Sequence, residues 1–350
     1  MRVIGTAIFI IFTSLVLAFQ ALSDTFTIDT ELDRGAFAVK FQANIPDGRD
    51  VKEFTLYRST NYLEVFGEGE LIKYPVTVIK IAAEKAGNSY LDRYVAHNTA
   101  YYYKVKMVDT HGNVTWSNTS EVKVPDVNPE INGKVSILVD KVHYILEISD
   151  GSKMIKRYPI ALGANPNDRK LHQDNATTPE GTYHIYGVKP QATYYRAYDI
   201  NYPNAVDRAR YRIWKERGLI KVRNGSIPTI GGSIQIHGMG IEKNWTWGCI
   251  AMRNRDIDEL FENKHIGKGT TVTIIGKEVN RKDVEQWTEN HGENMIRSIQ
   301  EKLIKYNAGA IDGEFGFKTS LAIGRFQFER GLPLTCDVDS LTISEILNQL

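Results

Sequence analysis

Short runs in which apolar and polar residues alternate extend along most of this chain, and they constrain its fold more than any other feature. A period of two places every second side chain on one face of a strand, so each run predicts a strand with one buried face. From Met295 the period changes, and Ile296, Ile299 and Leu303 fall on one face of a helix. We therefore expect a multi-domain, mainly β protein that ends in a small all-α domain. The clearest alternating runs are Phe37, Val39 and Phe41; Tyr101, Tyr103, Val105 and Met107; Val135, Ile137 and Val139; and Tyr144, Leu146 and Ile148.

The amino terminus predicts export. Residues 3–19 are almost entirely apolar and Ala21-Leu22-Ser23 fits the small-x-small rule for cleavage, so residues 1–23 are predicted to be a secretory signal peptide. An N-terminal membrane anchor is the alternative, because about 17 apolar residues can just span a bilayer, but no basic stop-transfer cluster follows. We expect the mature protein in the periplasm or the cell wall.

The balance of charges argues against a nucleic-acid partner. The chain has 43 basic and 42 acidic residues, and removal of residues 1–23 takes away one basic residue, Arg2, so the mature chain has no net charge. Proteins that bind nucleic acid usually carry a basic excess. Two cysteines are too few for a disulfide framework or a four-cysteine zinc site, so each of them needs its own explanation.

Residues 25–126 predict a β-sandwich, with turn residues at Asp109–Asn113 between two alternating runs. Within this region, Asn98–Val105, Asp109 and Trp116–Asn118 resemble the end of a fibronectin type III domain, in which Tyr101 would be the corner tyrosine. The tyrosines of this region could line a carbohydrate site, but core positions are the more common role for such residues.

The carboxy-terminal residues carry a second resemblance. Ile311–Gly316 predicts a turn between two helices, and apolar and polar residues follow it at fixed offsets. With these residues, 295–350 resemble the small three-helix peptidoglycan-binding domain, which implies a peptidoglycan partner. The matching positions after the turn are Thr319, Ala322, Phe326, Gln327, Gly331, Leu332, Val338 and Asp339.

Residues 133–277 hold a histidine and a cysteine in a pattern that suits acyl transfer. His237-Gly238 ends an alternating run, and after eleven intervening residues Cys249 follows Gly248. Acyl transfer needs a nucleophile, a base within hydrogen-bond reach, a group that orients the base, and donors for the oxyanion. Cys249 is the candidate nucleophile, and His237 can supply proton transfer and the positive charge that lowers a thiol pKa.

The two glycines can complete this set. Gly248 allows a sharp turn in which successive N–H groups face one oxygen, and the carbonyl of Gly238 is a candidate to orient the imidazole. A helix is predicted next, with Asn254 as its cap and Asp256 in its first turn.

These residues resemble the catalytic motif of the L,D-transpeptidase (YkuD-like) family. Ile236-His237-Gly238 matches its histidine segment, and Thr246–Ile250 matches its cysteine segment. Upstream, Thr178–Ile185 matches the family's Thr-Pro-x-Gly strand entry, and Tyr158–Gly163 matches the apolar run that precedes it. The resemblance covers residues 133–277 and implies a mainly-β catalytic domain.

The resemblance also implies roles. Cys249 would attack a carbonyl of a peptidoglycan stem peptide, and His237, oriented by the Gly238 carbonyl, would act as general base and then as general acid. Backbone N–H groups from Trp247 and Gly248 to Cys249 would stabilise the oxyanion. The family forms a thioester with the third stem residue, releases the terminal D-alanine, and needs no metal and no organic cofactor.

Three departures from the family pattern bear on substrate choice. Trp247 stands where many members have histidine, and Ala251 stands where many have an arginine that is expected to hold a substrate carboxylate. Arg253 is the candidate to replace that arginine. Thr246 is the other candidate substrate-binding residue, although a structural role suits it as well. The gap from His237 to Cys249 is also shorter than in many members.

Other interpretations stay open for several residues. Cys249 could be a buried structural thiol, or could form a disulfide with Cys336, which would inactivate the enzyme. His172, His184, His237 and Cys249 could form a zinc set, but none of them shares tight ligand spacing with another. The aromatic and basic stretch of residues 194–214 is either a lid over the stem peptide or a packed insertion.

Three functions follow from these expectations. The first is an exported peptidoglycan L,D-transpeptidase that passes the acyl group to an amine on another stem or on a wall-attached protein. The second is an L,D-carboxypeptidase, or another peptidoglycan hydrolase, in which water resolves the thioester. The third is a non-catalytic protein that binds the glycan and peptides of the wall through its outer domains.

Overall fold

The computed structural model places the described residues in two compact units. The first is built from residues before Asp126, and the second from the residues that follow, together with Ala96–Asn98 and the described part of Gly67–Pro75. The predicted signal peptide, Cys336 and most of the predicted linker at 277–294 lie outside the described residues. The structure describes residues 26–34, 38–45, 50–62, 71–82, 89–128, 130–131, 133–151, 153–168, 170–216, 218, 220–223, 225–276, 292–306, 308, 310–313, 315, 317–330, 332 and 340–347.

The first unit is the predicted sandwich. Its described strands form a three-stranded sheet, in the order β1 (Thr27–Asp33), β2 (Ala38–Asn44) and β5 (Ser89–Asp92). The second sheet has the order β4 (Val76–Ala82), β3 (Val51–Ser59), β6 (Thr99–Asp109) and β7 (Val114–Trp116), and β8 (Ser120–Val124) also pairs with β6. Tyr101 and Tyr103 of β6 are buried, so their core interpretation is confirmed.

A buried ion pair lies in the core of this unit. Arg58 on β3 donates from Nη1 to Asp92 Oδ2 at 2.6 Å, and both side chains are almost fully buried. The same guanidinium donates to Thr77 Oγ1 and to the Tyr94 carbonyl, and the hydroxyl of Tyr103 donates to Asp92. Removal of one partner would leave the other charge buried without its counter-ion.

We predict that Arg58→Met lowers the free energy of unfolding of this unit by about 3–5 kcal/mol, because Asp92 then keeps a buried, uncompensated charge. The control is Lys40→Met, which breaks the exposed Lys40–Glu31 pair and should cost less than about 1 kcal/mol. Amide hydrogen exchange of β3 and β6 in the full chain measures both changes. Equal protection in the two variants would contradict the prediction.

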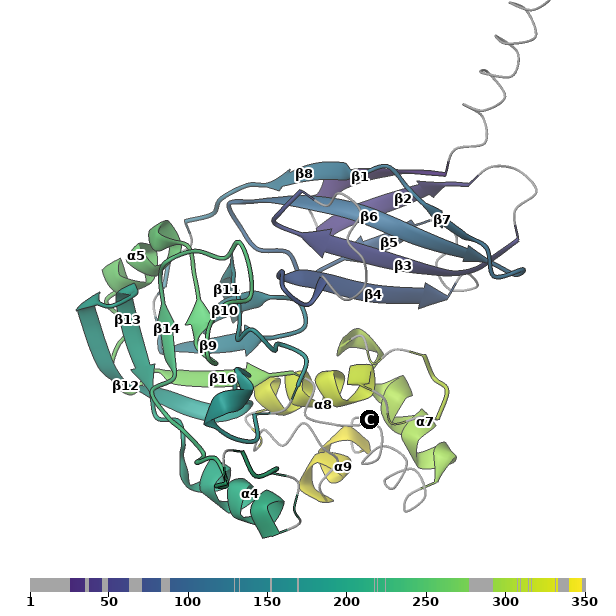
Figure 1. Ribbon diagram of the computed structural model, residues 1–350. Coiled ribbons are helices and arrows are strands. Elements are labelled where there is room, and N and C mark those ends of the chain that lie inside the picture. The colour runs from purple at the N-terminus through teal and green to yellow at the C-terminus, as the bar shows by residue number, and fades with distance from the viewer. Residues whose placement is uncertain are drawn as a thin grey trace, which may run out of the picture. The chain divides into compact units, whose positions relative to one another are not determined.

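The second unit is organised around an eight-stranded sheet of described strands. Their order is β11 (Lys153–Pro159), β10 (Ile145–Asp150), β9 (Val135–Asp140), β16 (Thr271–Ile275), β12 (Gly181–Ala192), β13 (Tyr195–Ile200), β14 (Gln235–His237) and β15 (Ile250–Ala251). Most pairs are antiparallel, but β9–β16 and β14–β15 are parallel. The helix α5 (Asn254–Glu262) packs beside β13, whereas α4 (Ala205–Glu216) lies at the opposite end of β12 (Figure 1).

The alternating residues of this sheet fill one core. Ile137 and Val139 of β9 pack with Ile236 of β14 and Ile250 of β15, and Leu260 of α5 belongs to the same cluster. This core fixes the edge of the sheet at which His237 and Cys249 occur.

The carboxy-terminal residues are helical, as predicted. The described helices are α7 (Glu293–Lys302), α8 (Phe317–Glu329) and α9 (Ser340–Leu347), with a short 3-10 turn η2 (Ile304–Tyr306) after α7 (Figure 1). Ile296, Ile299 and Phe326 are fully buried in their shared core. The predicted fold class, a β-sandwich followed by a mainly-β domain and a small all-α domain, is therefore confirmed.

Candidate active site

Parallel pairing of two short strands brings His237 and Cys249 to the same edge of the sheet. In the register of β14 and β15, Ile236 lies opposite Ile250, and His237 lies opposite Ala251. Ile236 and Ile250 point into the core, and Cys249 directly precedes β15, so strand alternation predicts that His237 and Cys249 point to the other face. The eleven residues between them form the connection that this parallel register requires.

The imidazole of His237 is held on several sides. Its Nδ1 lies 2.7 Å from the carbonyl oxygen of Gly238. Because a carbonyl oxygen can only accept, Nδ1 carries the proton and Nε2 presents a lone pair. The ring stacks on Tyr194 at a centroid distance of 4.9 Å and meets the edge of Trp245 at 5.4 Å. The contact that we expected between Gly238 and His237 is therefore present.

Burial favours the neutral form of His237. The side chain is 1% exposed, and burial lowers its pKa below the ordinary histidine value, against the opposing effect of the Gly238 carbonyl. Within the described residues, its Nε2 is buried and has no hydrogen-bond partner. An unpaired nitrogen in this state is ready to accept a proton from a neighbouring group.

Cys249 is a free, half-buried thiol. Its Sγ donates to the carbonyl oxygen of Ser233 at 3.7 Å. Burial raises the pKa of the thiol, while a backbone hydrogen bond at Gln235 and the charge of Lys170 pull the pKa down. These shifts favour the neutral forms of the Cys249 thiol and of the His237 imidazole.

The turn before Cys249 is tied by Thr246. The hydroxyl of Thr246 donates to the Cys249 carbonyl at 2.7 Å and accepts from the Gly248 N–H at 3.2 Å. Gly248 has a φ of +126°, and a Cβ there would lie 2.7 Å from the Thr177 carbonyl oxygen, so glycine is required. Thr246 thus has a structural place in the turn, and the Gly248 N–H can reach a substrate oxygen only by exchanging its bond to Thr246.

The segment after His237 is strained and closely packed. Met239 has a φ of +78°, and Ser233 and Tyr195 in the flanking segments also have left-handed φ values. A Cβ on Gly238 would lie 2.6 Å from Asn254 Oδ1 and 3.1 Å from the Cβ of Tyr195. Non-glycine residues in this conformation cost free energy and often occur at functional sites.

The expectation that Asn254 caps α5 is wrong. The cap position is Arg253, without a side-chain cap, and Asn254 is the first helical residue. Its Oδ1 instead accepts from the Met239 N–H at 2.8 Å, which ties the segment after His237 to the start of the helix. Asp256 does lie in the first turn, as predicted.

Arg253 is engaged away from the thiol. Its guanidinium forms a two-point pair with Asp256, with Nε–Oδ2 at 2.6 Å and Nη2–Oδ1 at 3.0 Å, and Nη1 donates to the Asn98 carbonyl. A role in holding a substrate carboxylate would require this pair to break.

Sequence reasoning missed Lys170. This lysine is 7% exposed, and its Nζ donates to the Trp247 carbonyl oxygen at 3.3 Å. Burial lowers its pKa to about 8, and the strongest electrostatic influence that raises the pKa is Cys249. A single lysine in the polar segment before Thr177 has no periodicity or motif by itself, so only the structure reveals its burial.

A cleft of about 480 Å³ lies at the β12–β13 hairpin and is lined in part by Tyr194, which stacks on His237. Gln235 and Tyr194 line it together with the tip of the β12–β13 hairpin, namely Lys189, Gln191, Ala192 and Thr193. Its volume falls in the range that holds a small peptide or ligand. Trp247 and Met239, which flank the two predicted catalytic residues, are largely exposed.

The aromatic stretch at 194–214 divides between several roles. Tyr198 and Tyr202 are buried in the core, which supports the packed interpretation for them, whereas Tyr194 contacts His237. Among the described residues, no group of three or more His, Cys, Asp or Glu side chains is placed to hold a metal ion. In the same part of the chain, no helix is long and apolar enough to cross a membrane.

Two family models match the chain. One, described as an L,D-transpeptidase catalytic domain, matches residues 134–274. The other, described as "Putative peptidoglycan binding domain", matches residues 292–346. Among curated proteins, "Putative L,D-transpeptidase YafK" of Escherichia coli (strain K12) is 28% identical over 120 residues, which are 33% of this chain and 40% of that protein. The chain thus spans about 40% of the length of the curated relatives that it matches.

Solved structures resemble separate parts of the chain. An L,D-transpeptidase from Xylanimonas cellulosilytica is 15% identical, with a TM-score of 0.27, over 42% of this chain and 63% of that one. A Fn3-like protein from Clostridium thermocellum is 23% identical, with a TM-score of 0.21, over 31% of this chain and 99% of that one. By the family models, this chain contains an L,D-transpeptidase catalytic domain of the YkuD family at residues 134–274 and a peptidoglycan-binding domain at residues 292–346.

Proposed function

We propose that this protein is an exported peptidoglycan L,D-transpeptidase in which Cys249 is the nucleophile and His237 is the general base. One observation carries the proposal: inside an L,D-transpeptidase domain, β14 ends at His237, whose Nε2 is unpaired, and pairs with β15, which the free thiol of Cys249 directly precedes. The Gly238 carbonyl fixes the tautomer that leaves Nε2 as the acceptor. The peptidoglycan-binding domain supports peptidoglycan as the partner.

The first half of the reaction forms a thioester. The thiol hydrogen swings from the Ser233 carbonyl to His237 Nε2, which takes the proton as Sγ bonds to the carbonyl carbon of the third stem residue. The carbonyl oxygen becomes an oxyanion, for which backbone N–H groups from Trp247 to Cys249 are the candidate donors. Collapse breaks the C–N bond, and the nitrogen of the departing D-alanine takes the proton from Nε2.

The second half resolves the thioester. An acceptor amine attacks the thioester carbon and gives its proton to Nε2, the C–S bond breaks, and the Cys249 sulfur recovers the proton from the imidazolium. The cleft lined by Gln235 and Tyr194 is the proposed binding site of a stem peptide, because Tyr194 also stacks on His237. The exposed side chains of Trp247 and Met239 suit contact with a large polymeric substrate.

The test is product analysis by mass spectrometry after incubation of the purified mature protein with tetrapeptide stems. Cross-linked dimers together with free D-alanine support transpeptidation. Tripeptides alone would show that water is the acceptor, which contradicts the transferase proposal but keeps the cysteine chemistry. An unchanged tetrapeptide would favour a wall-binding role without catalysis.

The pH dependence of kcat/KM follows from His237. The imidazole must be neutral to accept the thiol proton, and burial lowers its pKa, so activity should fall only below the ordinary histidine value near 6.5. Tyr194→Ala uncovers one face of the ring and should move this acid limb upward. Rates measured from pH 4.5 to 9 check both shifts, and an acid limb centred above pH 7 in the unaltered protein would contradict this assignment.

A further inference from the structure

Lys170 carries a charge that the mechanism above does not use. A buried ammonium loses its hydration, and this loss is offset only when other groups hold the charge. The Lys170 side chain is nearly inaccessible, and its Nζ donates to the carbonyl oxygen of Trp247, two residues before the nucleophile. Because burial of this ammonium costs free energy, we ask what function its charge contributes to the site.

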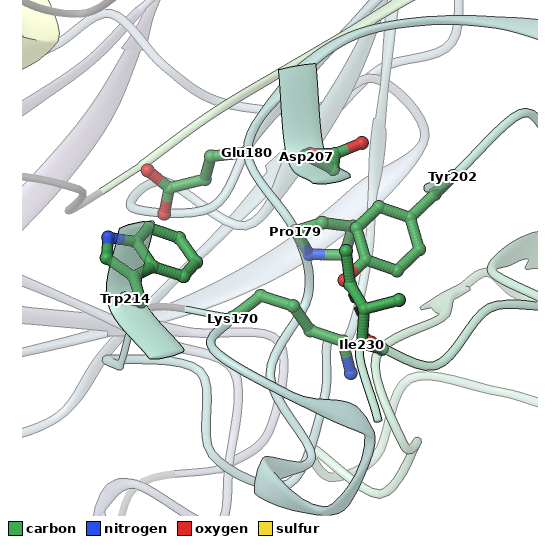
Figure 2. A pocket seen from close by; sticks show the side chains of 7 residues that line it. All are labelled: Lys170, Pro179, Glu180, Tyr202, Asp207, Trp214 and Ile230. Atoms are coloured by element: carbon green, nitrogen blue, oxygen red, sulfur yellow. Dashed lines mark hydrogen bonds between the residues drawn. The ribbon is translucent and has the colours of Figure 1, made fainter. Parts of the chain in front are cut away.

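The pocket around the Lys170 side chain does not supply that function. Its free volume is about 10 Å³, which is room for one water at most, so it cannot hold a substrate group. Figure 2 shows the side chain crossing this pocket with its ammonium directed toward Ile230 and away from the carboxylate of Glu180. The other lining residues are Pro179, Tyr202, Asp207 and Trp214. The charge therefore serves the neighbouring turn and not a ligand in the pocket.

The contact with Trp247 acts on the peptide group that leads to Cys249. In a trans peptide the C=O and the following N–H point in opposite directions. Lys170 holds the Trp247 carbonyl, so the Gly248 N–H of the same peptide is aimed at the other side, where it meets Thr246. A hydrogen bond from a cation to a carbonyl is stronger than a neutral one and polarises the amide, which makes its N–H a better donor.

The Lys170 ammonium lies close enough to Cys249 to act on its thiol as well. A Cβ built on Gly248 would lie 3.3 Å from Lys170 Nζ, so the ammonium lies against the residue that precedes Cys249. With a pKa of about 8, Lys170 is mostly charged at neutral pH, and its charge lowers the pKa of the Cys249 thiol. Asp174 and Lys141 also act on Lys170, and Asp199 acts on Cys249, while the carboxylates of Glu180 and Asp207 line the pocket that the Lys170 side chain crosses. Burial lowers the pKa of His237, which favours its neutral form.

We propose that Lys170 is a positioning residue for Cys249: its ammonium holds the Trp247–Gly248 peptide in the turn before the nucleophile and favours the thiolate. This proposal rests on the proposed function, because holding the turn and favouring the thiolate matter for catalysis only if Cys249 is the nucleophile. It places a cationic group near Cys249, on the side of the turn opposite Thr246.

The test measures alkylation of Cys249 by iodoacetamide in the full-length protein from pH 5 to 10, mapped by peptide mass. Lys170→Met should slow alkylation of Cys249 about tenfold at pH 7 and shift its midpoint to higher pH, because the thiolate loses its neighbouring cation. Cys336 in the same digest is the internal reference. Lys156→Met is the matched control, because Lys156 is also a buried lysine but pairs with Asp126 and Glu259. An alkylation profile of Lys170→Met equal to that of the unaltered protein overturns the proposal.

A second measurement uses the unaltered protein, so poor folding of a variant cannot obscure the result. Trace acetylation at a series of pH values gives the titration midpoint of each lysine by peptide mass. Blocking Cys249 with methyl methanethiosulfonate prevents it from forming a thiolate and should lower the midpoint of Lys170, and an unchanged midpoint overturns the proposal. Neither measurement needs peptidoglycan. If the protein did not turn over stem peptides, that result would contradict the proposed function but would not decide the role of Lys170.

Discussion

Cys249→Ala should abolish the release of D-alanine from tetrapeptide stems, with a loss of more than about 10⁴-fold in kcat. The reason is that the thioester cannot form without Sγ, and Thr246, the neighbouring hydroxyl, is bound on both sides within its turn. The side chain is only half-buried, so the fold should keep its melting temperature within a few degrees. Turnover by mass spectrometry and a thermal melt measure the two effects together.

The matched control for this prediction is Cys336→Ala. It removes the other thiol of the chain and should leave turnover unchanged, since Cys249 is free in the structure and the mechanism uses no disulfide. A faster rate of the unaltered protein after addition of reductant, or a faster rate of Cys336→Ala, would indicate that a disulfide between the two cysteines inhibits the enzyme. Product formation by Cys249→Ala at a rate near that of the unaltered protein would reject the nucleophile.

His237→Gln should reduce kcat by about 10²–10⁴-fold at pH 7, the range for loss of a general base. The rate of this variant should then rise with pH, because hydroxide can deprotonate the thiol in place of the imidazole. The unaltered protein, which keeps the imidazole, should not depend on hydroxide in this way. The control is His184→Gln on β12, since His184 is exposed and lies outside the site. Steady-state rates between pH 6 and 10 give the comparison.

Two outcomes would contradict the role of His237. A His237→Gln protein with full activity at pH 7 would mean that another group takes the thiol proton. A rate that stays low at every pH, with Cys249 still open to alkylation, would mean that His237 acts on the substrate and not on the thiol.

The sequence predicts the parts of this site that follow from strand order and motif. Ile236-His237-Gly238 and the segment that ends in Cys249 mark two strand ends, and the parallel register of β14 and β15 brings them together. The carbonyl of Gly238 is adjacent to His237 in the chain, so its contact needs no long-range information. The alternating runs predict the strands for the same reason, because their period is local.

The features of the site that the sequence does not predict depend on contacts between distant segments. Lys170 reaches Trp247 across 77 positions of sequence, and Tyr194 stacks on His237 only because the β12–β13 hairpin pairs with β14. Asn254 is of a residue type that often caps helices, but its amide oxygen accepts a hydrogen bond from the Met239 N–H in another segment. Tertiary contacts overrode the local preference in that case.

Intact-protein mass spectrometry of the acylated enzyme tests the central claim most directly. The purified mature protein is quenched with acid seconds after mixing with a tetrapeptide stem, and the adduct is mapped by digestion. The account predicts an adduct with the mass of the stem less its terminal D-alanine, labile to hydroxylamine, on Cys249 and not on Cys336, and absent from Cys249→Ala. A stable adduct on another residue, or D-alanine release by Cys249→Ala, would contradict it.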